Sequence, residues 1–134
     1  NSIIDRSVQQ ELKYYYNSDN AKYYDDFVKE ITDRNSIYQF RRVYIRKNKS
    51  NLCPALTASM GMGGHNVPII IDDYGIRKLT PYECLAFQGF PSNFEFPEMA
   101  DNHKYKQIGN SVSIPVVESI AKNIISALKT SDYS

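Results

Sequence analysis

The stretch Arg77-Lys78-Leu79-Thr80-Pro81-Tyr82-Glu83-Cys84-Leu85-Ala86-Phe87-Gln88-Gly89-Phe90-Pro91 contains the clearest local structural signals in the chain. Thr80 can cap a helix, Pro81 suits the first helical position, and Glu83 completes a capping box. Gly89 supplies a C-terminal stop, and a proline follows shortly after it. These signals predict a short helix that begins after Thr80 and ends near Gly89.

The residues immediately before this helix have the pattern of a buried strand. Val67 to Ile71 is apolar, and the turn sequence Asp72-Asp73-Tyr74-Gly75 follows it. Further upstream, residues 38–46 are β-branched and aromatic enough for another strand, although their alternation slips at Arg41-Arg42. The slip predicts a bulge. A continuous strand would place Arg42 and Arg46 on one face and Arg41 on the other.

Two further segments have helical periodicity. The first runs from Ala21 to Arg34, and the second begins near Ser113 and ends near Lys129. The second segment has an apolar stripe formed by Val117, Ile120, Ala121, Ile124 and Leu128. Residues 47–66 are predicted to form a loop with a short strand near Leu56. The predicted fold class is α+β.

The distribution of charge is more informative than its sum, because the 134 residues have a net charge of only +1. The segment between Arg41 and Lys49 has no acid and contains the basic residues Arg41, Arg42, Arg46, Lys47 and Lys49. A basic stripe on a neutral protein fits a phosphate-facing edge. Two alternatives remain open: a solvated strand with scattered positive charge, and ion pairs with the acidic segment 25–33.

Composition limits the class of protein. A hydrophobic fraction of 42% and a charged fraction of 23% are typical of a soluble globular domain. The longest uninterrupted apolar run is Val67 to Ile71, and no basic-then-apolar leader opens the chain, so we expect a cytoplasmic protein without a membrane partner. Cys53 and Cys84 are too few for a disulfide framework. With His65 and His103 they lack the paired spacing of a zinc site, and we expect no metal.

Two glycine-containing segments are candidate binding sites. In Gly61-Met62-Gly63-Gly64-His65-Asn66, the glycines permit positive φ and let the backbone approach a phosphate or a base edge. A glycine-rich surface loop is the simpler alternative there. Gly109-Asn110-Ser111-Val112 comes just before the last predicted helix, where a turn can offer free backbone N–H groups to a carboxylate. A simple helix cap is the alternative for this segment.

The stretches 77–91 and 106–116 resemble, in order and spacing, the last two signature blocks of the cytosine-5 DNA methyltransferases. The segments 41–46 and 54–67 resemble that family's target recognition domain. The resemblance covers roughly residues 38–128, and the first block has a mostly structural role in the family. It implies a small-lobe and target-recognition fragment whose C-terminal helix packs on an α/β, Rossmann-like catalytic lobe.

This resemblance divides the chain into three regions. Residues 1–37 are a poorly matched lead-in with one amphipathic helix. Residues 38–75 form the target recognition region. Residues 76–134 contain the small-lobe block and the C-terminal helix on the cofactor side.

The resemblance also implies which residues contact the ligands. In the family a recognition loop enters the major groove of double-stranded DNA around a flipped cytosine. The implied DNA-binding residues are Arg41, Arg42, Arg46, Leu56, Thr57, Gly61, Gly63, Gly64, His65 and Asn66. Asn110, Ser111 and Val112 are implied to hold the amino acid end of S-adenosylmethionine. The family usually has threonine where this chain has Ala55, so the resemblance supplies no hydroxyl contact to the DNA backbone there.

The resemblance supplies no catalytic residue. The family's nucleophile is a cysteine that follows a proline, whereas Cys53 precedes Pro54 and Cys84 lies within the predicted capped helix. No glycine-rich cofactor loop follows an opening strand, and no Glu-Asn-Val block is present. We therefore expect the recognition part of a restriction–modification methyltransferase, inactive without its catalytic lobe. A fragment of a longer polypeptide, a natural small subunit of a split enzyme and a non-catalytic DNA-binding module remain open.

Overall fold

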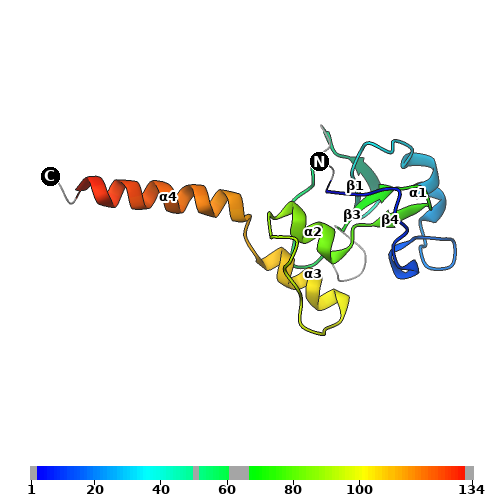
Figure 1. Ribbon diagram of the computed structural model, residues 1–134. Helices are drawn as coiled ribbons and strands as arrows, with labels where there is room; N and C mark the ends of the chain where they lie inside the picture. The colour runs from blue at the N-terminus through cyan, green and yellow to red at the C-terminus, as the bar shows by residue number, and fades with distance from the viewer. Residues whose placement is uncertain (1–2, 50–51, 61–66, 132–134) are drawn as a thin grey trace.

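The computed structural model describes residues 3–49, 52–60 and 67–131, and its core is an antiparallel sheet with helices on both faces (Figure 1). The strand order in the sheet is β2-β1-β3-β4. The elements are η1 (Leu12–Tyr14), α1 (Tyr24–Glu30), β1 (Tyr38–Arg41), β2 (Tyr44–Lys47), β3 (Pro68–Ile71), β4 (Ile76–Lys78), α2 (Pro81–Phe87), α3 (Asp101–Asn110) and α4 (Ile114–Ser131). This arrangement confirms the predicted α+β class.

β1 and β2 form a hairpin, so the single bulged strand predicted for residues 38–46 is wrong. The register pairs Arg41 with Tyr44, which leaves only Arg42 and Val43 in the turn. Arg42 adopts a φ of 50°, a left-handed conformation that reverses the chain. The slip in alternation at Arg41-Arg42 is therefore the signature of a turn. The sequence suggests a bulge there instead, because the turn lacks the glycine or asparagine that usually marks a hairpin.

β3 continues into β4 through the turn predicted at residues 72–75. The Asp72 carboxylate accepts hydrogen bonds from the backbone N–H groups of Tyr74 (2.8 Å) and Gly75 (3.0 Å), which close the turn. β4 then pairs Ile76 with Ile71. The strand β4 was not predicted, because its three residues are too few to show a clear alternation.

α1 covers one face of the sheet and is shorter than the helix predicted between residues 21 and 34. It ends at Glu30, shortly before Asp33, whose carboxylate accepts hydrogen bonds from the Asn35 backbone (2.9 Å) and the Ser36 hydroxyl (2.9 Å). This local turn competes with continuation of the helix. The core on this face is formed by Phe27, Ile31, Tyr38, Phe40, Ile69 and Ile76.

α2 and α3 cover the opposite face of β3 and β4. α2 begins with the predicted capping box: Thr80 Oγ1 accepts from the Glu83 backbone N–H (3.2 Å), and the Glu83 carboxylate accepts from the Thr80 N–H (2.8 Å). α3 was not predicted, because only Tyr105 and Ile108 among its residues are large and apolar. The second core cluster lies here and is formed by Ile4, Ile37, Met60, Val67, Ile70, Leu79, Cys84, Leu85, Tyr105 and Ile108.

Three consecutive tyrosines attach the N-terminal segment to the rest of the fold. The Tyr14 hydroxyl donates a hydrogen bond to Asp101 on α3 (2.8 Å), and the Tyr15 hydroxyl donates to Asp72 after β3 (2.8 Å). The Tyr16 ring lies edge-on against an aromatic ring of α1, with centroids 5.2 Å apart. The lead-in region is therefore an integral part of the same folded body.

α4 extends away from this body, and none of its residues is buried (Figure 1). Its bounds agree with the helix predicted from near Ser113 to near Lys129. Its first turn is attached to the body, because the Ile114 N–H donates to the Gln88 carbonyl (2.9 Å). Gly89 has a φ of 83° and lies so close to Pro115 that a Cβ there would be 2.6 Å from the proline ring. The helix is thus anchored at one end only.

Candidate nucleic-acid interface

The hairpin holds the three arginines that were expected to contact DNA. Opposed residues of antiparallel strands project to the same face, and successive residues project to opposite faces. Gln39 is paired with Arg46, and Arg41 with Tyr44, so Arg41 and Arg46 lie on one face. The expectation that Arg42 and Arg46 share a face opposite Arg41 is therefore wrong. Arg42 lies in the turn, at the tip of the hairpin.

One alternative for the basic residues between Arg41 and Lys49 was an ion pair with the acidic segment 25–33. A lysine forms such a pair. Lys47 Nζ lies 2.6 Å from Asp33 Oδ2. Together with hydrogen bonds from Asn35 and Ser36, this contact lowers the pKa of Asp33 to about 2. The three arginines are exposed, and their side chains make no hydrogen bond or ion pair with any residue that the structure describes. Their guanidinium groups are available to a ligand.

Arg42 is expected to tolerate glycine better than any β-branched residue. A left-handed conformation costs a residue with a Cβ about 1–2 kcal/mol, which glycine avoids at an entropic cost of roughly 0.5–1 kcal/mol. We expect Arg42→Gly to change the free energy of unfolding by less than about 1 kcal/mol, and Arg42→Val to lower it by about 1–3 kcal/mol. Urea unfolding of the two variants measures the difference. Equal stability of both would contradict the left-handed turn.

The loop expected to enter the major groove is described as far as Met60. Leu56 and Thr57 are half-buried, and Leu56 packs against the second core cluster. Met60 is fully buried in that cluster and donates its N–H to the Thr57 carbonyl (3.1 Å). Residues 52–60 contain no strand, so the short strand expected near Leu56 is absent from this part. Five expected DNA-binding residues lie outside the described residues: Gly61, Gly63, Gly64, His65 and Asn66.

The base of this loop lies directly against the end of α3 at Gly109. A Cβ on Gly109 would lie 2.1 Å from the carbonyl carbon of Thr57 and 2.2 Å from the backbone nitrogen of Ala58. No side-chain atom fits at such distances, so the two backbones approach each other only because residue 109 is a glycine. This contact brings the loop base next to the segment expected to hold the cofactor.

The turn expected just before the last helix is present at residues 111–113, two residues later than predicted. Gly109 and Asn110 are the last residues of α3. Ser111 ends the helix, because its backbone N–H (3.1 Å) and hydroxyl (2.6 Å) both donate to the Ile108 carbonyl. Asn110 and Val112 are exposed, and the Val112 N–H has no partner among the described residues. The three expected cofactor-binding residues therefore lie together at the α3–α4 junction.

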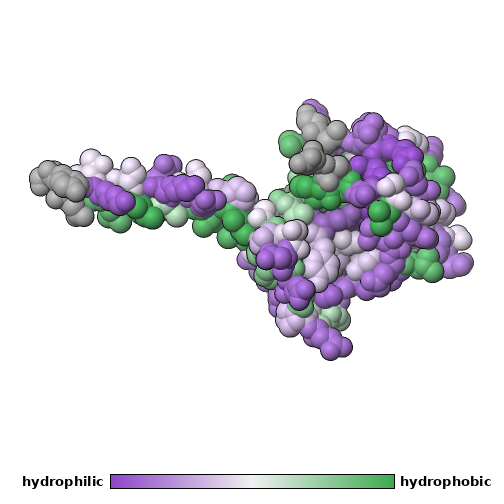
Figure 2. Space-filling view, viewed as in Figure 1, coloured by the Kyte–Doolittle hydropathy of each residue, from purple (hydrophilic) through white to green (hydrophobic). Residues whose placement is uncertain are grey.

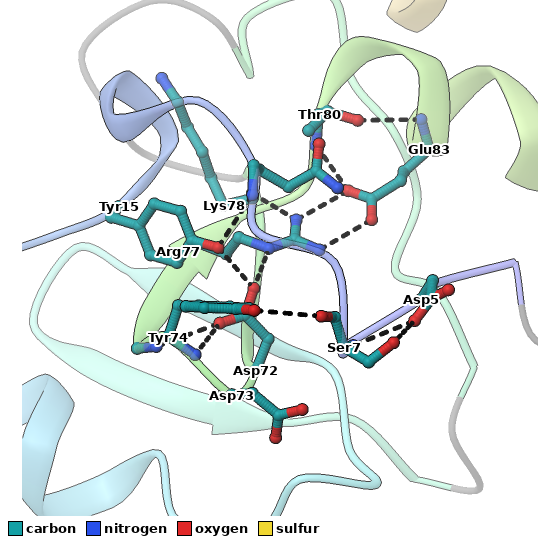
Figure 3. Close-up of polar contacts among 12 residues, drawn as sticks. Asp5, Ser7, Tyr15, Asp72, Asp73, Tyr74, Arg77, Lys78, Thr80 and Glu83 are labelled. Carbon is teal, nitrogen blue, oxygen red and sulfur yellow. Dashed lines mark hydrogen bonds and ion pairs between the residues drawn. The ribbon is translucent and has the colours of Figure 1, made fainter.

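A buried charge network lies between β4, α2 and the N-terminal segment (Figure 3). The fully buried Arg77 donates from Nε to Asp72 (2.6 Å) and from both terminal nitrogens to Glu83 (2.8 Å each). Tyr15 donates to the same Asp72 oxygen (2.8 Å). Burial opposes the charge on Arg77, but the contacts with Glu83 and Asp72 outweigh it and raise its pKa. Tyr15 and Asp72 could not be predicted as partners of this network, because no local spacing in the sequence connects them.

Neither cysteine is suited to act as a nucleophile at neutral pH. Burial raises the pKa of Cys53 to about 12 and also raises the pKa of Cys84. Both thiols are therefore protonated, and the thiolate is the reactive form. Within the described ranges, no group of three or more His, Cys, Asp or Glu residues is placed to hold a metal ion.

The chain matches the family model described as C-5 cytosine-specific DNA methylase over residues 2–126. It is 49% identical over 126 residues to the type II methyltransferase M.Bsp6I of Bacillus sp. (strain RFL6), an alignment that covers 94% of this chain and 40% of that protein. M.SsoII of Shigella sonnei is 50% identical over 62 residues, which cover 45% of this chain and 16% of that protein. No solved structure matches the chain significantly.

These matches extend the similarity beyond the segments that the sequence motifs indicated. The family match begins at residue 2, so it includes nearly all of the lead-in region. The chain spans 40% of the length of M.Bsp6I and 16% of the length of M.SsoII. The greater part of each relative therefore has no counterpart here.

Proposed function

Because the chain belongs to the C-5 cytosine-specific DNA methylases, we propose that it supplies the DNA-recognition part and one edge of the cofactor site of a cytosine-5 DNA methyltransferase. The relatives' names, type II methyltransferases, support a role in a restriction–modification system. S-adenosylmethionine, when bound, supplies the methyl group for carbon 5 of cytosine. A cysteine outside this chain would attack carbon 6 of the flipped base.

The contact at Gly109 is the observation that supports this function most directly. Methyl transfer requires the target base and the methyl donor to meet at bonding distance. The loop proposed to contact DNA and the segment proposed to hold the cofactor come from separate parts of the sequence. Gly109 joins them backbone to backbone, against Thr57 and Ala58. This arrangement suits an enzyme in which both ligands converge on one edge of this chain.

The α3–α4 junction offers groups that fit the amino acid end of S-adenosylmethionine. The Asn110 side chain is exposed and bonds to no described residue, so its amide can donate to a carboxylate. The backbone N–H groups of Val112 and Ser113 can do the same, since neither has a described partner. The Ser111 hydroxyl already donates to Ile108, and its lone pairs can accept from the ammonium group.

The exposed face of α4 supports a catalytic lobe as the second partner. One side of the helix is apolar and the other polar, as Figure 2 shows. Its large apolar side chains are between 44% and 60% exposed: Val116, Val117, Ile120, Ile124, Ile125 and Leu128. A contiguous patch of six exposed apolar side chains is typical of an interaction surface. A self-contained DNA-binding module would have no use for it.

The hydropathy of α4 raises the question of whether this helix crosses a membrane. By length and mean hydropathy alone, the segment Asp101–Ser131 is long and apolar enough to cross a bilayer. The polar side of α4 contains Glu118, Lys122 and Lys129, which a spanning helix would have to bury in hydrocarbon. A helix that is apolar on one side and charged on the other suits packing on a protein surface. We therefore propose the catalytic lobe, and no membrane, as the partner of α4.

Substitutions on the two sides of α4 test this proposal. We expect Ile120→Asp combined with Ile124→Asp to prevent assembly with the rest of the enzyme and to abolish methyl transfer, because buried carboxylates without partners are strongly unfavourable. The matched control, Ser119→Asp combined with Ser126→Asp, places the same charges on the polar side and should change neither property. Gel filtration measures assembly, and transfer of labelled methyl groups to DNA measures activity. Equal loss in both variants would contradict the proposed docking face.

The intact mass of the native gene product distinguishes the two forms that the enzyme can take. A mass equal to that of these 134 residues would identify a separate subunit, whose partner co-purification would then find. A larger mass would identify a single polypeptide that contains the catalytic lobe. Methyl transfer by the assembled enzyme, and none by this chain alone, is the expected result in either case.

A further inference from the structure

The turn between α3 and α4 is held at both ends by backbone contacts. We name residues 110–113 the cofactor turn, because they include the three residues proposed above to hold S-adenosylmethionine. On the α3 side, Gly109 lies against the loop base. On the α4 side, the Ile114 N–H donates a hydrogen bond to the Gln88 carbonyl at the end of α2 (2.9 Å). The cofactor turn is therefore a short segment between two fixed points, beside α2 and α3 (Figure 1).

The contact on the α4 side depends on the glycine at position 89. Gly89 ends α2 in a left-handed conformation, with a φ of 83°, and its N–H donates to the Ala86 carbonyl (3.0 Å). A Cβ at this position would lie 2.6 Å from Cδ and 2.9 Å from Cγ of Pro115. A proline ring is rigid and cannot rotate away. Any side chain at position 89 would therefore push the first turn of α4 away from α2.

A rigid cofactor turn favours binding because its polar groups are already in place before the ligand arrives. The N–H groups of Val112 and Ser113 have no described partner, and both must reach the same small carboxylate. Groups that are ordered in advance lose little conformational entropy on binding. A misplacement of about 1 Å, even one caused far from the reacting atoms, can cost roughly 100-fold in efficiency. The contacts that hold the turn are thus expected to control affinity for the cofactor.

We propose that Gly89 is a positioning residue for S-adenosylmethionine: it lets the end of α2 hold the first turn of α4, and so fixes the α4 end of the cofactor turn. The proposal deepens the cofactor role above and rests on it. Gly109 and Gly89 have complementary tasks, since the first joins the cofactor turn to the loop base and the second joins it to α2. The end of the segment 77–91 would in this way act on the cofactor without contacting it.

The first test measures binding of S-adenosylmethionine to the complete enzyme by calorimetry, well below the unfolding temperature. We expect Gly89→Ala to weaken this binding by roughly 10- to 100-fold and to leave DNA binding nearly unchanged. Gly75→Ala is the matched control, because residue 75 also has a positive φ (143°) but its Cβ would lie 3.7 Å from the nearest atom, an ordinary contact. It should lower stability without changing cofactor affinity. Unchanged affinity in Gly89→Ala, or equal losses in both variants, would overturn the proposal.

The second test separates the contact with α4 from backbone strain at residue 89. Pro115→Ala removes the two ring atoms that the added methyl group would meet, and the next atom, Ile114 Cβ, lies at 3.7 Å. In the Pro115→Ala enzyme, we therefore expect Gly89→Ala to weaken cofactor binding by less than about threefold. A loss as large as that in the unmodified enzyme would mean that the strained φ is the cause. Positioning through α4 would then be overturned.

The third test follows the contact itself in the cofactor-free complete enzyme. The Ile114 amide should exchange its hydrogen roughly tenfold faster or more in Gly89→Ala, because its hydrogen bond to Gln88 would open more often. Amide exchange measured by NMR gives this rate. Faster exchange with unchanged cofactor affinity, or unchanged exchange, would overturn the positioning role. If the unmodified complete enzyme bound no S-adenosylmethionine, the proposed function itself would be overturned instead.

Discussion

Replacement of Gly109 by alanine is expected to displace the loop base from α3 and to lower the free energy of unfolding by about 2 kcal/mol net. The added methyl group would lie 2.1–2.3 Å from backbone atoms of Thr57 and Ala58. Overpacked sites typically cost about 1–3 kcal/mol, and the upper end applies here because no side chain can rotate away. Alanine regains only about 1 kcal/mol through its better helix propensity. Thermal unfolding and methyl transfer by the complete enzyme measure the two consequences.

The matched control for Gly109→Ala is Gln107→Ala, an exposed position in the same helix. It adds no atom to the contact and should change stability by less than about 0.5 kcal/mol. If Gly109→Ala left stability and activity unchanged, α3 and the loop would not be in contact. DNA and cofactor would then have no shared edge on this chain at which to converge.

The elements that could be predicted from the sequence are those specified by local chemistry. Thr80, Pro81 and Glu83 lie within four residues and specify the start of α2 by themselves. α4 was predictable because its apolar residues recur at helical spacing. The hairpin was not, since Arg42 occupies a left-handed position where glycine or asparagine normally gives the signal. An element can be predicted where its residues have strong local preferences. It is missed where a residue such as Arg42 departs from the preference of its position.

The candidate site was predictable as a set of residues and not as an arrangement. The basic segment indicated three arginines, but the faces they occupy depend on the strand register, which is set by the turn at Arg42 and Val43. Similarly, no spacing in the sequence shows that Gly109 lies against Thr57, about 50 residues away in the chain. Contacts between distant segments depend on the whole fold, because many different registers satisfy the same local pattern. Only the structure distinguishes Arg41 and Arg46 from Arg42.

Replacement of Arg77 by methionine is expected to be the most destabilising change in the interior, with a loss of about 3–5 kcal/mol. The Arg77 side chain is fully buried between the carboxylates of Asp72 and Glu83, whose side chains are 0% and 11% exposed. Methionine fills much of the volume, but it leaves two buried acids without a counter-charge, and breaking such a pair typically has this cost. Urea unfolding of the complete enzyme measures the loss. It should depend little on salt, because buried charges are poorly screened.

The control for Arg77→Met is the same substitution at Arg34, which pairs with Asp73 at the surface. Both partners there are about half exposed, at 52% and 43%, so Arg34→Met should lower stability by no more than about 1 kcal/mol. Removing one acid should partly rescue the interior variant: Arg77→Met with Asp72→Asn should lose less than the sum of the single changes. Additive losses would mean that the uncompensated carboxylates are not the cause. The cost would then come from the lost packing of the arginine side chain alone.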